Sequence, residues 1–261
     1  MTTTNRNPQQ VDPKHPGQYS GDEMPLVEHL AELRSRLIKC LIGVVLGMVL
    51  GFYFVDDIFR ALYNLIEAAT AGRATIQQIG PTETFTAYIK VSFLAGVALA
   101  MPVIVYQLVA FISPGLTRSE RGYVLRALPF ISILFFAGLA FAYFIVLRSA
   151  LGFLLTFGLP EIERNLRISD TISFVTNLMI WVGVSFEMPV VVYTLIKLRI
   201  VTANQLAAWR RYALILIVVA AAIITPTPDP LNMLLVAVPM YLLFELGIIL
   251  GRIGTRGSNR V

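Results

Sequence analysis

The amino-acid sequence predicts an all-α polytopic membrane protein, in which six transmembrane helices follow an N-terminal amphipathic helix. Of its 261 residues, 56% are hydrophobic and 14% are charged, whereas about 25% of the residues of soluble domains are charged. Apolar runs long enough to cross a bilayer recur along the chain. Lysine and arginine concentrate in alternate loops, a bias that is typical of membrane topology.

Three regions are expected: a disordered tail over residues 1–23, a six-helix membrane domain over residues 24–251 and a second tail over residues 252–261. The first tail is polar, and Pro13 and Pro16 discourage a helix there. It lacks an apolar stretch followed by small residues, so no cleavable signal peptide is expected.

Residues 25–39 are predicted to form an amphipathic helix that lies along the membrane surface. Four leucines recur at helical spacing, while acidic and basic residues occupy the other faces. Such a helix can bury its apolar face at the interface, and Pro25 suits a first helical position. The leucines are Leu26, Leu30, Leu33 and Leu37.

The first two spans are predicted over residues 40–55 and 91–111. Three glycines of the first span fall at i, i+4 and i+8, which lets another helix approach closely. They are Gly43, Gly47 and Gly51. Pro102 predicts a kink in the second span. The connection over residues 56–90 has apolar residues of its own and is expected to fold onto the bundle as short helices.

The third span is predicted over residues 127–147 and the fourth over residues 171–196, separated by a second long connection. The fourth span carries Glu187 within an apolar run. A charge at the middle of a bilayer costs about 3 kcal/mol on insertion scales, and such residues are functional candidates by default. The alternative is a carboxylate that pairs within the bundle for packing alone. Pro189 removes a backbone donor and predicts a bend beside it.

The fifth span, residues 212–224, is short, because 13 residues of helix span about 20 Å and the hydrocarbon is roughly 30 Å thick. A proline-rich reversal follows, with Asp229 as N-cap and Pro230 as the first residue of the sixth span. That span carries Glu245 near its far end. Two short adjacent spans predict local thinning of the bilayer or a partner.

Two capping boxes are predicted at helix starts in the loops after the second and fourth spans. Thr117 and Glu120 form the first, and Thr202 and Gln205 form the second.

Charge predicts the orientation. The N-terminal segment as far as Lys39, the C-terminal tail and the loops after the second and fourth spans hold 15 of the 21 lysines and arginines, and the two other long connections hold six. The positive-inside rule therefore places both termini in the cytoplasm.

The composition argues against enzymatic chemistry, a cofactor or a metal. Cys40 is the single cysteine, and His15 and His29 both precede the first apolar run, so neither an intramembrane Ser-His dyad nor a zinc site is expected. The chain has no phosphate-binding Gly-Lys-Ser/Thr loop. It also has no basic patch with interleaved aromatic residues, so nucleic acid is not an expected partner.

Five separated stretches resemble the TatC family, the multispanning subunit of the twin-arginine protein translocase, and together they cover residues 24–252. They are Leu30-Ala-Glu-Leu-Arg-Ser-Arg-Leu37; Pro102-Val-Ile-Val-Tyr-Gln107 with Ala110-Phe-Ile-Ser-Pro-Gly-Leu116 and Ser119-Glu-Arg121; Ala140-Phe-Ala-Tyr-Phe144; Gly183-Val-Ser-Phe-Glu-Met-Pro189; and Thr227-Pro-Asp-Pro230 with Val238-Pro-Met-Tyr241 and Phe244-Glu-Leu-Gly247.

The resemblance implies a receptor and core subunit in the cytoplasmic membrane of a prokaryote. TatC-like proteins bind signal peptides that carry two consecutive arginines on folded cargo. They recruit single-span TatB- and TatA-like partners, assemble into multisubunit complexes, and depend on the proton-motive force. A proton-coupled small-solute transporter is the alternative, since Glu187 and Glu245 with proline-bent helices would suit one. Against it, the six spans show no obvious inverted repeat.

The resemblance also implies signal-peptide-binding residues. The acidic residue of the first cytoplasmic loop falls on Glu120, and the family's aromatic residue falls on Phe111. A carboxylate can pair in bidentate fashion with a guanidinium but not with an ammonium, which explains a demand for arginine. Glu32 is the natural second carboxylate, with Arg34 and Arg121 beside the two acids.

Each of these residues can also have a purely structural role. Glu120 also fits the capping box, and Phe111 suits an interfacial anchor. Arg34 can be a solvated charge, and Glu32 can pair with Arg36 at i+4.

By the same resemblance, Glu187 is expected to line a concave, partly hydrated face where the signal peptide inserts as a hairpin. The short fifth and sixth spans resemble a docking surface for the partner helices. Its residues are Thr225, Thr227, Asp229, Met233 and Glu245. Two positions depart from the family: Leu65 stands where a proline is frequent, and Asn232 or Met233 stands where a glutamine is common.

Overall fold

The computed structural model describes residues 26–70, 74–112, 132–156, 164–197, 199–225 and 229–256. Glu120, Arg121 and Thr227 lie outside the described residues, as do the capping box that starts at Thr117 and most of both tails.

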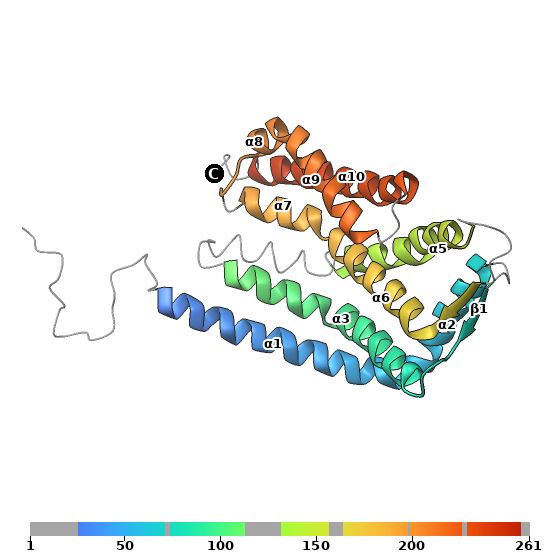
Figure 1. Cartoon of the computed structure of the whole chain (residues 1–261). Helices are drawn as coiled ribbons and strands as arrows, with labels where there is room; N and C mark the ends of the chain where they lie inside the picture. The colour runs from blue at the N-terminus through green and yellow to red at the C-terminus, as the bar shows by residue number, and fades with distance from the viewer. Residues whose placement is uncertain are drawn as a thin grey trace, which may run out of the picture.

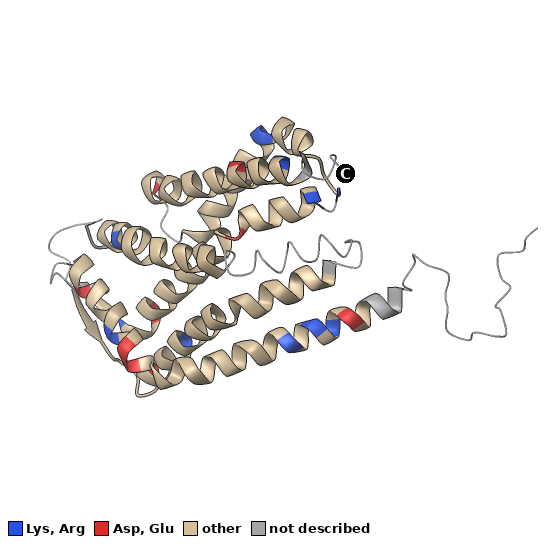
Figure 2. Cartoon of the chain, turned by 180° about the vertical axis from the view of Figure 1, so that it is seen from behind, with Lys and Arg blue, Asp and Glu red and all other residues tan. Residues whose placement is uncertain are grey.

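The predicted all-α membrane fold is confirmed. Five helical segments are long and apolar enough to cross a membrane within the described ranges. They are Leu30–Tyr53, Glu83–Phe111, Ser132–Leu154, Ile168–Lys197 and Pro230–Gly254. Figure 2 shows long stretches of helix without charged residues, as a bilayer requires.

The amphipathic segment and the first span form one helix, α1 (Leu26–Tyr53), rather than the separate surface helix that the sequence suggested. No proline or glycine lies between Leu26 and Gly43, so nothing interrupts the helical hydrogen bonds where the span begins. At 28 residues, α1 is about 42 Å long, which exceeds the roughly 30 Å of hydrocarbon. Its charged first turns therefore extend beyond the apolar layer.

Helix α1 packs along α3 (Glu83–Ile112) through glycines, as the spacing predicted (Figure 1). A Cβ added at Gly47 would lie 2.7 Å from the carbonyl oxygen of Gly96, and one added at Gly51 would lie 2.7 Å from Cβ of Ala95. These distances are too short for real side chains, so the two backbones are in direct contact.

The first long connection folds as predicted, with α2 (Val55–Thr70) packed on the bundle, but it also contains a strand that the sequence did not suggest. Strand β1 (Ala74–Gln77) pairs in parallel with β2 (Arg164–Arg167) from the second connection, with Ala74 opposite Arg164 and Gln77 opposite Arg167.

One ion pair fixes the base of this two-stranded sheet. Oε1 of the buried Glu83 accepts hydrogen bonds from Nε of Arg167 (2.7 Å) and from the backbone N–H of Gly80 (2.9 Å). An arginine is charged at physiological pH in any environment of this kind, and the hydrogen bond to Glu83 raises the pKa of the Arg167 guanidinium further. The start of α3 is thereby tied to the start of α6 (Ile168–Ser185).

The third span ends later than predicted. Residues 132–141 are helical, π-helix η2 (Ala142–Val146) follows, and α5 (Leu147–Thr156) continues the same segment. The predicted end at residue 147 is wrong because Arg148 does not stop the helix. Its side chain is exposed, and a long cationic side chain can reach the interface from within a span. The predicted start at residue 127 lies outside the described residues.

The fourth span is broken at the predicted bend. Helix α6 ends at Ser185 and α7 (Met188–Lys197) begins after a turn at Phe186 and Glu187. The N–H of Glu187 donates to the carbonyl of Val184 at 3.0 Å, and Pro189 has no N–H to donate. By contrast, α3 continues through Pro102 as one helix.

The last three helices are α8 (Ala203–Ala208), α9 (Arg210–Ile224) and α10 (Pro230–Arg256). The predicted capping box of Thr202 and Gln205 is present at the start of α8. In Figure 1 the start of α1, the end of α3 and the end of α10 lie at one end of the molecule, and α2 with β1 lies at the other. The ends of the described chain therefore share one side of the bundle.

Candidate functional site

A polar cluster joins the start of α1 to the last turns of α3. Nε of Arg36 donates to Oε1 of Glu32 at 2.9 Å, and Nη2 contacts the same oxygen. Nη1 of Arg36 reaches Oε1 of Gln107 on α3 at 3.4 Å. The guanidinium therefore bridges a carboxylate on its own helix and an amide on the neighbouring helix.

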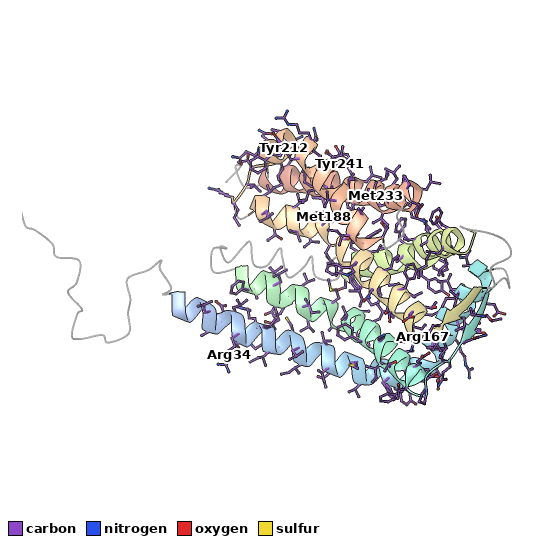
Figure 3. The ribbon with its side chains drawn as sticks, viewed as in Figure 1. Arg34, Arg167, Met188, Tyr212, Met233 and Tyr241 are labelled. Atoms are coloured by element: carbon purple, nitrogen blue, oxygen red, sulfur yellow. The ribbon has the colours of Figure 1, made fainter. Side chains whose placement is uncertain are left out.

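Three of the residues expected to bind a signal peptide can be placed. Glu32 belongs to the cluster, and Phe111 is half-buried one turn beyond Gln107, just before α3 ends. Arg34 is exposed and lies on the side of α1 that faces away from α3 (Figure 3). The fold therefore brings Glu32 and the end of α3 together and leaves Arg34 apart from them. Glu120 and Arg121 follow α3 in the sequence, outside the described residues.

Gln107 was not singled out from the sequence. It is 9% exposed, although an amide is a costly group to bury without partners. The available signal was a glutamine in the long apolar run of residues 93–112, five residues before the end of α3. The charged turns of α1 lie beside this part of α3.

Glu187 sits in the turn between α6 and α7, and its side chain is 6% exposed. None of the described residues donates a hydrogen bond to either carboxylate oxygen. A buried carboxylate without donors is costly, so packing does not account for its place in the bundle.

The walls around Glu187 are closely packed. The ring of Phe186 lies 5.5 Å from the ring of Phe141, centroid to centroid, and a Cβ added at Gly138 would lie 2.8 Å from Phe186. On the other side, a Cβ added at Gly247 of α10 would lie 2.7 Å from Val192 of α7. These contacts hold the broken helix in place, so the carboxylate is presented by a rigid turn.

The residues expected to dock partner helices do not form one patch. Thr225 and Asp229 are buried at the end of α9 and the start of α10. Asp229 caps α10: Oδ2 accepts from the backbone N–H of Asn232 at 2.8 Å, and Oδ1 accepts from its side-chain amide at 3.0 Å. Both oxygens of Asp229 are thus used within the chain.

Glu245 lies 16 residues after Asp229, about 24 Å further along α10. Its carboxylate pairs with Arg210 at the start of α9, with Nη2 to Oε2 at 2.8 Å, and accepts from the hydroxyl of Tyr241 at 3.1 Å. Glu245 therefore joins the two last helices to each other. Met233, half-buried on α10, lies near the Asp229 end (Figure 3).

Comparison with known proteins identifies relatives over most of the chain. The family model described as Sec-independent protein translocase protein (TatC) matches residues 28–239. The TatC protein of Aquifex aeolicus is 39% identical over 91% of this chain and 99% of its own length. That of Escherichia coli K12 is 38% identical over 92% of this chain and 93% of its own.

The fold comparison agrees. A crystal structure described as the twin arginine translocase receptor TatC superposes with a TM-score of 0.73 at 38% identity, covering 87% of this chain and 99% of the other. A second crystal structure of that receptor superposes with a TM-score of 0.75 at 39% identity. A family match over residues 28–239 and relatives of nearly full coverage lead to one conclusion: this chain belongs to the TatC family.

Proposed function

We propose that this protein is the receptor and core subunit of a twin-arginine translocase. It binds the twin-arginine signal peptides of folded proteins and recruits single-span TatB- and TatA-like subunits, and the proton-motive force drives export. The observation that carries the proposal is the match over residues 28–239, together with the likeness to structures described as the receptor.

Signal recognition is assigned to the end of the bundle where α1 starts and α3 finishes. In the free protein, Arg36 binds Glu32. A signal arginine presents the same guanidinium fork, so it can take the place of Arg36 on the carboxylate. Glu120, in the loop that follows α3, provides a carboxylate for the second arginine, and Phe111 packs against the peptide.

Glu187 is assigned to the hairpin form of the signal peptide. A buried carboxylate with no described donor offers acceptors to a polar group that enters the bundle. The rigid turn between α6 and α7 keeps those acceptors in place while the peptide is inserted.

Partner recruitment is assigned to α9 and the adjoining start of α10. Helix α9 buries only Ile217 and Ala221, while Leu216 and Ile223 are 70% and 79% exposed. At 15 residues it is about 22 Å long, so the bilayer beside it must thin or a partner must cover it. Counted with the five longer segments, α9 makes six spans, so both termini lie on one side of the membrane. The positive-inside bias of the sequence supports the cytoplasm as that side.

Photocrosslinking tests the receptor role. A photoreactive residue at Phe111 in native membranes is offered a twin-arginine signal peptide or the same peptide with twin lysine. Crosslinks that form with arginine, and that disappear both with lysine and with Glu120→Ala, support the proposal. Equal crosslinking to both peptides, or none to either, contradicts the assignment of this site.

A further inference from the structure

A cavity of about 340 Å³ lies between α1, α3 and α6, away from the cluster at Arg36 and from Glu187. Most of its wall is apolar, from Met48 on α1, Ile89 and Phe93 on α3, and Ile180 on α6. Phe93 is 45% exposed, so the cavity opens on the surface of the bundle, where lipid surrounds a membrane protein.

One cation lines this apolar cavity. Nζ of Lys90 donates to Oγ of Ser173 at 2.5 Å, and no carboxylate lies within ion-pair distance of it in the described part of the chain. An ammonium has three N–H donors, and the hydrogen bond to Ser173 uses one of them. The exposed amide of Asn177 adds a further polar group to the wall.

The depth of Lys90 indicates what the cavity can hold. Lys90 lies seven residues after the start of α3, a helix of 30 residues. With α3 centred in the bilayer, the Cα of Lys90 is about 11 Å from the midplane, and the hydrocarbon ends at about 15 Å. The ammonium therefore lies where acyl chains meet head groups, on the side of β1 and β2.

We propose that this cavity binds an anionic phospholipid, whose phosphate is held by Lys90 and Asn177 while an acyl chain lies along the apolar wall. The positive charge of Lys90 complements the head group, and the apolar residues complement the acyl chain. A water-soluble anion would leave the apolar wall uncovered, and a protein segment would have to carry an acidic side chain to a depth where charges are costly. This inference is independent of the proposed translocase role.

Native mass spectrometry of the purified full chain tests it, with phosphatidylglycerol, phosphatidylcholine and glycerol 3-phosphate as probes. We expect phosphatidylglycerol to be retained preferentially, and Lys90→Gln to weaken its binding about fivefold, the effect of removing roughly 1 kcal/mol for one lysine near a membrane surface. Lys90→Arg should keep most of the binding, and Asn177→Ala should weaken it less than Lys90→Gln. The matched control is Arg148→Gln, an exposed cation at the same end of another span, which should bind as the unmodified protein does.

Three results would overturn the proposal: unchanged retention in Lys90→Gln that is still folded by circular dichroism, equal retention of phosphatidylcholine, or displacement of the lipid by an equal concentration of glycerol 3-phosphate. A photoreactive residue at Phe93 in native membranes separates lipid from protein as the occupant. A mass gain of one phospholipid supports the proposal, and an adduct to a polypeptide alone contradicts it.

Discussion

At Glu32, a single carboxylate oxygen is bound by two nitrogens of Arg36. The pair is partly exposed, with side-chain accessibilities of 20% for Arg36 and 24% for Glu32, and such pairs contribute about 1 kcal/mol or less. Stability alone is thus a weak reason for the pair. Under the proposed receptor role the pair has a second purpose, in which Arg36 occupies the carboxylate until an arginine of the signal peptide replaces it.

Competition of this kind predicts that Arg36→Gln tightens the binding of a twin-arginine peptide by about two- to fivefold, because the peptide no longer displaces an internal partner worth up to about 1 kcal/mol. The measurement is fluorescence anisotropy of a labelled peptide with protein in nanodiscs. Lys39→Gln, an exposed cation one turn further along α1, is the control. A loss of affinity as large as that of Glu32→Gln would mean that Arg36 positions the carboxylate rather than blocking it.

We expect the Glu187 carboxylate to lower the stability of the protein and yet to be required for export. Because none of the described residues donates to its carboxylate, Glu187→Leu should stabilise the protein in detergent by about 1–3 kcal/mol while it abolishes export of a twin-arginine reporter. The measurements are the unfolding midpoint and the fraction of reporter exported by whole cells.

The exposed acid Asp57 on α2 provides the control for that experiment, since Asp57→Asn should change neither quantity. A lower unfolding midpoint in Glu187→Leu would show that the carboxylate is held by bonds within the protein. A stable variant that still exports the reporter would remove Glu187 from the mechanism.

The sequence could reveal some of these residues and not others, for a physical reason. Glu187 stands out because a charge inside an apolar run has a known cost, wherever the chain folds. The contacts of Arg36 with Gln107 and of Arg210 with Glu245 join positions 71 and 35 residues apart, and no local pattern records such a pairing. For the same reason the ion pair of Glu245 could not be foreseen, and the assignment of Glu245 to partner docking stays a prediction.

Among the elements, the pair of α1 and α3 depends on the absence of side chains at a few positions. A Cβ added at Gly96 would lie 2.7 Å from the backbone nitrogen of Met48 and 2.8 Å from the carbonyl oxygen of Val44. Both neighbours are backbone atoms and cannot rotate away. The helices would have to separate along their length, with loss of the contacts on either side.

We therefore predict that Gly96→Ala lowers the free energy of unfolding by about 1–3 kcal/mol, the usual cost of overpacking a close contact. Gly152→Ala is a matched control, because a Cβ there meets nothing within 4 Å. In a helix that substitution should stabilise by up to about 1 kcal/mol. Unfolding in mixed micelles measures both. Equal stability of the two variants would contradict the close approach of α1 and α3.

Helices were predictable and strands were not. Each span shows in the sequence as an apolar run, uncharged except for Glu187 in the fourth and Glu245 in the sixth. The turn at Phe186 and Glu187 follows from Pro189. Strands β1 and β2 have four residues each and come from connections about ninety positions apart. Runs that short carry no period that could distinguish a strand from a loop. The third span was predicted to end too early because the charge of Arg148 was taken as its boundary, whereas the helix continues to Thr156.

For the whole molecule, the two long connections act as one unit at the end opposite the start of α1 (Figure 1). Their sheet is short, so its stability must come from the side chains that brace it. Glu83 is the central brace, since its carboxylate accepts from Arg167, Ile79 and Gly80. It is buried at the point where β1 leads into α3.

Glu83→Gln is therefore expected to loosen both strands together, although only one of them is near it in sequence. The amide keeps one acceptor oxygen but loses the charge that holds the Arg167 guanidinium. Hydrogen–deuterium exchange should show faster exchange at residues 74–77 and 164–167 alike, with α1 and α10 unchanged. Arg60→Gln, an exposed cation on α2, is the control and should leave both strands protected. Faster exchange in β1 alone would show that Glu83 acts only as a local cap of α3, and that the two connections are joined by the strand pairing itself.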